Sequence, residues 1–208
     1  MRIYIRHAHK AYKNGKPPLV RRRSRINHKD HSWEHDRSKT FHLHDPPLTE
    51  IGKREAALVA EKLLDLYPTP THIITSPYLR ARETAAIMAG VIVKRAPPAK
   101  IDIICQTDIG EYLGNHAGSK LDVSPSTARH QPQHPETFEQ FQERIKKHHT
   151  DWSITTKEES DEVTWVITHG IVISEIIKPW HGSITKIPYL GYIVMDNATD
   201  KPAISFGV

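Results

Sequence analysis

Short apolar segments alternate with longer segments of helical periodicity along most of this chain, and this alternation constrains the fold more than any other feature. The strand-like segments are RIYIR (2–6), THIITS (71–76), IDIIC (101–105), VTWVITH (163–169), GYIVMD (191–196) and AISFGV (203–208). Strands that alternate with helices pair in parallel and need helices on both faces of the sheet. The sequence therefore predicts an α/β fold, with three layers (α/β/α) around a mostly parallel mixed sheet.

Helix boundaries follow from capping and breaking residues. The first helix is expected to start at Thr49 and to end before Pro68. Its apolar positions predict a single buried face, made of Ile51, Leu58, Val59, Leu63 and Leu66. A second helix is predicted over 78–90, ending at Gly90, and a third begins after Pro135. Thr137 and Gln140 have the spacing of a capping box for this third helix, and residues 170–180 predict a fourth.

The chain has 208 residues, which suits one domain spanning 1–208. Two long stretches show no sustained period, namely 10–46 after the first strand and 112–135 after the third. We expect both to be loops that form a cap over the carboxyl ends of the strands.

Cysteine content and hydropathy indicate the compartment. Cys105 is the only cysteine, so no intrachain disulfide can form. The N-terminal residues lack the apolar run of a signal peptide, and no stretch approaches the 18 apolar residues of a membrane span. These features lead us to expect a cytoplasmic protein without a membrane partner.

The formal charge of +5 is concentrated in one segment. Residues 10–44 hold ten lysines and arginines against three acidic residues, and they include the cluster RRRSR at 21–25. This segment could attract phosphates, nucleic acid or an acidic protein surface. Three of its histidines, His28, His31 and His35, are spaced loosely like metal ligands, but they lie in a loop without cysteine.

Charged side chains and histidines follow the predicted strands at their carboxyl ends, where ligands bind in such sheets. Arg6 and His7 follow the first strand, Arg80 lies one turn into the helix after the second, Glu111 follows the third, and His169 ends the fourth. Asp108 lies close to Glu111 in the sequence and is an alternative carboxylate.

Together these side chains suit a phosphoryl group. The planar fork of arginine matches phosphate oxygens. A histidine held among arginines has a lowered pKa and stays neutral and nucleophilic. A carboxylate near a bound dianion keeps its proton and can act as a general acid. The helix that starts at Gly170 points its N-terminal amides at the same place.

At these positions the sequence resembles the histidine phosphatase superfamily, which has the phosphoglycerate mutase-like fold. The matching stretches, in the order of the family, are RHA (6–8), DPPLTEIGKREA (45–56), TSPYLRARETA (75–85), EYLG (111–114) and THG (168–170). The resemblance covers most of the chain. Ala8 stands where the family usually has glycine.

The resemblance implies roles for individual residues. His7 would be the nucleophile that attacks phosphorus, and Glu111 would protonate the leaving oxygen. Arg6, Arg80 and His169 would bind the phosphoryl group. The implied enzyme is a metal-independent histidine acid-type phosphatase with no cofactor. It would act on a phosphorylated small molecule or a phosphoprotein.

One branch of the superfamily is more similar than the others. The long gap between RHA and DPPLT, together with TKIPYLG (185–191), is similar to the catalytic domain of the suppressor of T-cell receptor signalling (ubiquitin-associated and SH3 domain) phosphatases. That branch implies phosphotyrosine or small aryl and alkyl phosphates as substrates, and by analogy a homodimer. Lys10 stands where the branch has a further arginine, and it is expected to bind phosphate without a bidentate fork.

Three other functions stay open at this stage. A catalytically weak protein could bind phosphate as an interaction scaffold, and a phosphoglycerate mutase-type phosphotransferase could use the same residues. The pattern Glu-Arg-x-Tyr-Gly of the mutase branch is absent at 111–115. A nucleic-acid binder would need aromatic residues interleaved with the 21–25 cluster, and the cluster has none.

Overall fold

The computed structural model describes residues 1–11, 45–97, 100–112, 136–155, 162–182, 186–195 and 202–205. Apart from their ends, the two predicted cap loops at 10–46 and 112–135 lie outside these residues. None of the helices in the described part of the chain is long and apolar enough to cross a membrane.

Six strands form one mixed sheet. In spatial order they are β3 (Asp102–Cys105), β2 (His72–Thr75), β4 (Thr164–Thr168), β1 (Arg2–Arg6), β5 (Tyr192–Met195) and β6 (Pro202–Ser205). Strands β3, β2, β4 and β1 pair in parallel, whereas β5 runs antiparallel to β1 and β6 antiparallel to β5. The predicted mixed sheet is confirmed, and the carboxyl ends of its four parallel strands meet at one edge.

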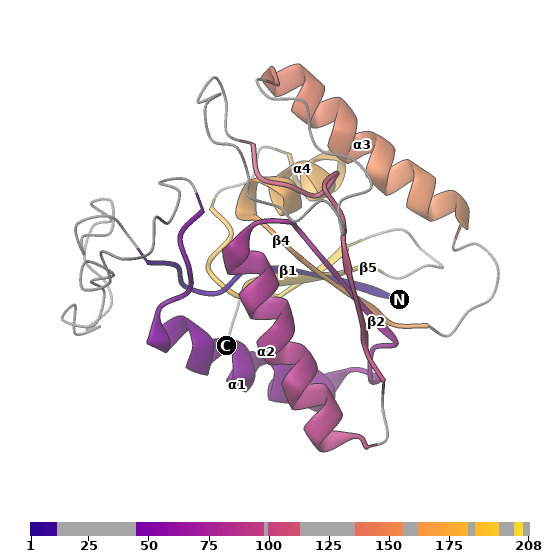
Figure 1. The fold of residues 1–208 in the computed structure, drawn as a ribbon. Coiled ribbons are helices and arrows are strands. Elements are labelled where there is room, and N and C mark those ends of the chain that lie inside the picture. The colour runs from indigo at the N-terminus through magenta and orange to yellow at the C-terminus, as the bar shows by residue number, and fades with distance from the viewer. Residues whose placement is uncertain are drawn as a thin grey trace.

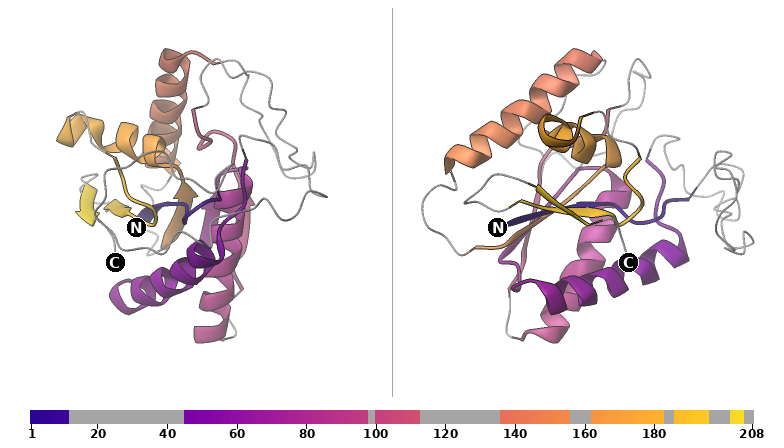
Figure 2. Two further views of the ribbon diagram at one scale, coloured as in Figure 1. Left: turned by 90° about the vertical axis from the view of Figure 1, so that its left-hand side faces the viewer. Right: turned by 180° about the vertical axis from the view of Figure 1, so that it is seen from behind.

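The helices form two layers, one on each face of the sheet. They are α1 (Glu50–Leu66), α2 (Leu79–Arg95), α3 (Phe138–Thr155) and α4 (Gly170–His181). Helices α1 and α2 pack together on one face, and α3 and α4 on the other (Figures 1 and 2). The chain moves outward through β2 to β3 and then returns to β4. Because parallel crossovers are right-handed, this reversal of direction moves α3 to the opposite face.

The core consists of two clusters separated by the sheet. On the side of α1 and α2, Ile3 and Ile5 of β1 belong to one buried cluster with residues of both helices. On the side of α3 and α4, Tyr4 of the same strand packs in a cluster with Phe141 and Ile173. Successive residues of a strand face opposite sides, so the alternation in RIYIR serves both clusters at once.

The predicted buried face of α1 was partly wrong. Helix α1 starts after its Thr49 cap as expected, but Leu58 and Leu66 are largely exposed. The buried face consists of Gly52, Ala56, Val59, Ala60 and Leu63. Three of these residues, Gly52, Ala56 and Ala60, are small, and they recur at helical spacing. Val59 and Leu63 were predicted correctly, but counting only large apolar side chains missed Gly52, Ala56 and Ala60 and wrongly included Leu58 and Leu66.

Helix α2 continues past Gly90 to Arg95, so the predicted end was also wrong. A β-carbon at Gly90 would meet no described atom within 4 Å, and Ile92 beyond it is fully buried. Packing of the last turn thus outweighs the cost of a glycine in a helix, about 1 kcal/mol.

The capping box of α3 is confirmed. The Thr137 amide donates to Oε1 of Gln140 at 2.8 Å, and the Gln140 amide donates to Oγ1 of Thr137 at 3.2 Å. Helix α3 begins at the next residue, Phe138.

Candidate active site

His7 lies directly after β1 and is almost completely buried. Its ring Nδ1 is 2.8 Å from the carbonyl oxygen of Ala8. A carbonyl only accepts, so Nδ1 carries the proton and Nε2 keeps its lone pair. Burial, and then the nearby His169 and Arg80, lower the pKa of His7 well below its usual value. The ring is therefore neutral, with an unprotonated nitrogen available as a nucleophile.

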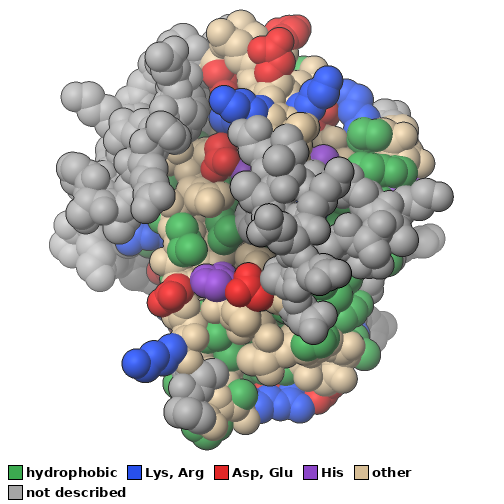
Figure 3. Space-filling view, turned by 90° about the vertical axis from the view of Figure 1, so that its right-hand side faces the viewer, with side chains coloured by type: hydrophobic (Ala, Val, Ile, Leu, Met, Phe, Trp, Pro, Cys, Tyr) green, Lys and Arg blue, Asp and Glu red, His purple; other side chains and the backbone are tan. Residues whose placement is uncertain are grey.

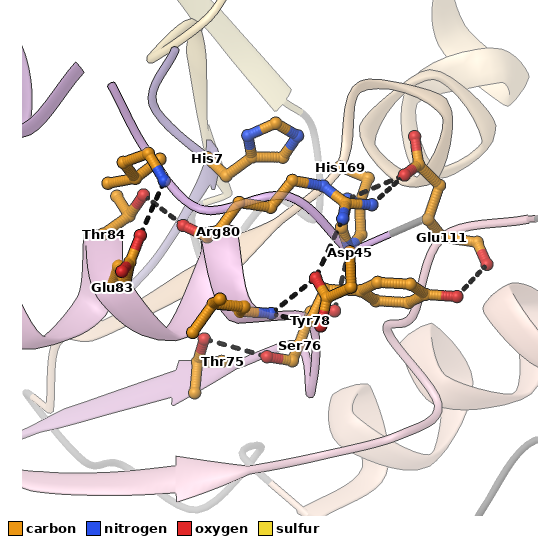
Figure 4. A network of polar contacts seen from close by, with 12 residues as sticks. His7, Asp45, Thr75, Ser76, Tyr78, Arg80, Glu83, Thr84, Glu111 and His169 are labelled. Carbon is orange, nitrogen blue, oxygen red and sulfur yellow. Dashed lines mark hydrogen bonds and ion pairs between the residues drawn. The ribbon is translucent and has the colours of Figure 1, made fainter. Parts of the chain in front are cut away.

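Arg80 lies one turn into α2 and has no solvent exposure. Its Nη1 donates to Oδ1 of Asp45 at 3.1 Å, and its Nη2 forms an ion pair with Oε2 of Glu111. The guanidinium also lies over the ring of Tyr78, 4.5 Å from the centroid. Figure 4 shows Arg80 between the two carboxylates, with His7 on one side and His169 behind. Two acidic groups and a ring thus fix one cation in a water-poor site.

His169 directly follows β4 and occupies the N-cap position of α4. Its Nε2 is 2.7 Å from Oγ of Ser76, which follows β2, and its Nδ1 is 3.6 Å from Oε2 of Glu111. Burial and then Arg80 lower the pKa of His169 well below its usual value, so this ring is also neutral. The rings of His7 and His169 lie edge to face, 5.2 Å apart between centroids.

Arg6 is the last residue of β1. Its Nη1 donates to the carbonyl of Ile187, and its guanidinium stacks on Tyr189, 4.1 Å from the ring centroid. A β-carbon on Gly170 would lie 3.3 Å from Cδ and Nε of Arg6. The glycine at the start of α4 therefore lets the arginine lie close against the helix N-terminus.

Lys10 and Glu111 belong to the same group of charges. Burial lowers the pKa of Lys10, and Glu111 acts in the opposite sense. Burial alone would raise the pKa of Glu111, but Arg80, then Lys10 and His7, outweigh it and hold this pKa below its usual value. In the free site Glu111 is therefore ionised.

Asp108, the alternative carboxylate, lies elsewhere. Its Oδ2 is 2.6 Å from Nδ1 of His148 on α3, whereas Arg80 pairs with Asp45 and Glu111. Of these two carboxylates, Glu111 of the EYLG motif is the one that pairs with Arg80 and lies beside His169.

The structure brings together the six residues predicted to bind or transfer the phosphoryl group: Arg6, His7, Lys10, Arg80, Glu111 and His169. Two further residues of the site were missed, Asp45 and Tyr189. Asp45 accepts from the Leu79 amide at 2.7 and 2.9 Å and so caps α2 from a distant segment. Tyr189 contacts Arg6, His7 and His9. The only sequence signals were the motifs DPPLT and IPYLG that contain them.

Close backbone contacts hold the segment that follows β1. A β-carbon at Gly52 would lie 2.3 Å from the carbonyl oxygen of His9, so only glycine lets α1 approach this closely. The buried Ala8 donates its amide to Oγ1 of Thr84 on α2 at 3.1 Å. The alanine that departs from the family pattern therefore fits here without exposure to solvent.

The described residues contain no group of three histidine, cysteine or acidic side chains arranged to hold a metal ion. The loop histidines His28, His31 and His35 and the basic cluster 21–25 lie outside the described residues.

Several solved structures are similar over nearly the whole chain. Ecdysone phosphate phosphatase from Bombyx mori, in complex with tungstate, has 17% identity and a TM-score of 0.66, covering 100% of this chain and 93% of its own. Phosphoglycerate mutase from Bacillus anthracis has 16% identity and a TM-score of 0.61, covering 100% and 91%. The protein histidine phosphatase SixA has 12% identity and a TM-score of 0.52, covering 98% and 93%. At these identities the similarity shows the fold, which is phosphoglycerate mutase-like.

The family comparison is based on sequence. No curated protein sequence matches this chain significantly. The profile of the histidine phosphatase superfamily (branch 1) matches residues 28–198, most of the chain. Arg6 and His7 precede the matched range, so their place in the site comes from the RHA motif and from the geometry around Arg80 and His169. With the sheet order, the converging side chains and the profile in agreement, the chain belongs to the histidine phosphatase superfamily.

Proposed function

We propose that this protein hydrolyses phosphomonoesters through a phosphohistidine at Nε2 of His7. The observation that carries the proposal is the contact of Nδ1 with the Ala8 carbonyl, which leaves Nε2 unprotonated in a buried, cationic site. The superfamily contains phosphatases and mutases, as the similar structures illustrate. Nε2 would form a bond to phosphorus while the bond from phosphorus to the leaving oxygen breaks. Water would then attack the phosphohistidine and release phosphate.

The cations have separate roles in this proposal. Arg6 and Arg80 supply planar donors to the phosphoryl oxygens, and Lys10 supplies a point charge. His169, which already contacts Ser76, offers a neutral ring beside His7. Fixed positive charge stabilises the transferring phosphoryl group without reorganisation. These groups can do so without a metal ion, and we expect turnover to persist in EDTA.

The Arg80–Glu111 ion pair suggests how the general acid acquires its proton. In the free site Arg80 holds the pKa of Glu111 down and keeps the carboxylate ionised. A phosphoryl dianion would share Arg80 and bring negative charge close to Glu111, and both effects raise the pKa of Glu111. Substrate binding would therefore prepare Glu111 to donate a proton to the leaving oxygen.

We propose aryl and alkyl phosphomonoesters, phosphotyrosine among them, as the substrate class. Support comes from the similarity of the spacing and of TKIPYLG to the suppressor of T-cell receptor signalling phosphatases. The fold similarity to an ecdysone phosphate phosphatase is consistent with this class. Tyr189, which stacks on Arg6 and lies 5.5 Å from the His7 ring between centroids, adds an aromatic wall to the site.

We do not propose nucleic acid as a partner. On the side shown in Figure 3, the described basic and acidic side chains are interspersed and do not form a single basic field. The RRRSR cluster lies outside the described residues.

The decisive experiment is to trap the phosphoenzyme. Protein mixed with 32P-labelled aryl phosphate is quenched in alkaline detergent, because phosphohistidine survives base and is lost in acid. The label should map to His7, and His7→Ala should abolish labelling and lower kcat by about a thousandfold or more. His9→Ala, two residues away and bonded to Thr49, is the matched control and should still be labelled.

Other outcomes would support other functions. Label at His7 that passes to a phosphoglycerate acceptor and not to water would identify a mutase. Tight binding of phosphate without label or turnover would identify a scaffold. Wild-type turnover in His7→Ala would overturn the proposal.

A further inference from the structure

Three consecutive backbone carbonyls precede Glu111, and side chains from other elements bind all of them. Arg144 of α3 donates from Nη1 to the carbonyls of Asp108 at 2.6 Å and Gly110 at 3.3 Å. Thr168, the last residue of β4, donates to the carbonyl of Ile109 at 2.7 Å. The loop that carries Glu111 is thus bound by α3 and β4 through its backbone.

Arg144 is itself held in one orientation. Its Nε donates to Oε2 of Glu136 at 3.0 Å, and its Nη2 pairs with Oε1 of the same carboxylate. Both side chains are largely buried, and the guanidinium lies 5.1 Å from the ring centroid of Phe141. A bidentate pair with a buried carboxylate fixes the plane of the guanidinium. The remaining nitrogen, Nη1, therefore points at the loop carbonyls from a fixed position.

The loop has little freedom to compensate for the loss of this contact. The Gly110 amide donates to the Thr107 carbonyl at 3.0 Å, which closes a tight turn immediately before Glu111. A β-carbon at Gly110 would lie 3.0 Å from the same carbonyl oxygen. The direction in which Glu111 leaves the turn depends on the Gly110 carbonyl, and Arg144 holds that carbonyl.

We propose that Arg144 is a positioning residue that sets the orientation of Glu111 for proton donation to the leaving oxygen. The inference rests on the proposed function and adds a requirement for a planar, multidentate cation at this position. Lysine cannot bind two carbonyls and both oxygens of a carboxylate at the same time. Arg144→Lys keeps the charge next to Glu136 and removes the geometry.

The test uses the dependence of the rate on the leaving group. Proton donation matters most for alkyl phosphates and least for nitrophenyl phosphate, whose leaving group needs little protonation. Arg144→Lys should lower kcat for an alkyl phosphate on the order of tenfold or more, since small misplacements of catalytic groups have effects of this size. Its kcat for nitrophenyl phosphate should stay near that of the wild type. Lys147→Ala, on the exposed side of α3, is the control and should change neither rate.

A double-mutant cycle with Glu111→Gln separates positioning from a structural role. If Arg144 acts through Glu111, Arg144→Lys adds no further loss for the alkyl phosphate once Glu111 is glutamine. Equal losses for both substrates, or losses that multiply in the double variant, would overturn the inference. If Arg144→Lys does not fold, Glu136→Gln provides the same test, because it frees the guanidinium and should produce a smaller loss of the same selectivity.

The two proposals can fail separately. Turnover in His7→Ala would remove the proposed function whatever Arg144 does. If His7→Ala is inactive and Glu111→Gln selectively loses alkyl phosphates, but Arg144→Lys shows no such selectivity, only the inference about Arg144 fails.

Discussion

Helix α2 has an arginine between two carboxylates at each of its ends, and the two ends differ in burial. At the N-terminal end, Nη1 of Arg80 is 3.1 Å from Asp45, and Nη2 pairs with Glu111. At the C-terminal end, Nη1 of Arg95 is 3.1 Å from Glu61, and Nη2 pairs with Asp65. The side chain of Arg80 is 0% exposed and that of Arg95 is 40% exposed.

This difference shows that the surroundings of an ion pair, and not its composition, determine what it can do. Solvent and salt screen the pairs of Arg95, which therefore contribute little. Arg80 lies at the carboxyl edge of the parallel strands, beside two neutral histidines, where charges interact more strongly. In the proposed function, a phosphoryl group that entered this edge would meet a preoriented, buried cation.

The largest difference in activity is expected between two variants, each of which removes one of these arginines. Arg80→Ala should lower kcat/KM for any phosphomonoester about a thousandfold, by analogy with the loss of a preorganised oxyanion donor. Arg95→Ala should leave kcat/KM unchanged. Steady-state kinetics with nitrophenyl phosphate, together with circular dichroism to verify folding, checks both. Comparable losses in the two variants would mean that the distinction between the two ends is wrong.

The carboxylates offer a second comparison, with a smaller effect. Glu111→Gln should lower kcat for alkyl phosphates about a hundredfold, because glutamine cannot donate the proton. For nitrophenyl phosphate the loss should be slight. Glu61→Gln at the exposed end should alter neither substrate. A Glu111→Gln variant that loses both activities equally would indicate that this carboxylate orients Arg80 and does not donate a proton.

The smallest expected effect is on stability as a function of pH. His7 and His169 have lowered pKa values in the folded protein because they are buried beside arginines. Below about pH 6.5 these two histidines are protonated in the unfolded chain but stay neutral in the folded protein. The free energy of unfolding should therefore fall as the pH decreases from 7 to 5. Urea unfolding should show a shallower decline for His7→Gln. In the control Arg95→Ala, the free energy of unfolding should depend on pH with the same slope as in the wild type. If His7→Gln also keeps the wild-type slope, the neutral state assigned to buried His7 is wrong.

Features that depend on neighbours in the sequence were predictable. The segment RIYIR alternates and is followed by His7, so both the strand and the position of Arg6 and His7 at its carboxyl end could be inferred. The capping box of Thr137 and Gln140 spans three residues and formed as predicted. Order along the chain was also sufficient to place Arg80 and His169 at one edge, because the carboxyl ends of parallel strands coincide.

Features that depend on contacts between distant segments were not predictable. Ala56 is buried and Leu58 is exposed because of how α1 docks, and Gly52 allows the helix to lie close against the backbone of His9, a residue 43 positions away. The end of α2 depends on the burial of Ile92 beyond a glycine. These outcomes arise from packing, which no local pattern encodes.

The sequence by itself determined the α/β class, the superfamily and the residue types of the site, because strand periodicity, motif order and local capping are short-range properties. Only the tertiary structure decided that Asp45, 35 residues from Arg80, shares that arginine with Glu111, and that Arg144 binds the carbonyl before Glu111. Contacts between residues this far apart in the sequence depend on which side chains the folded chain brings close together and buries. A low-dielectric interior then gives their charges a strength that the same residues lack at the exposed end of the same helix.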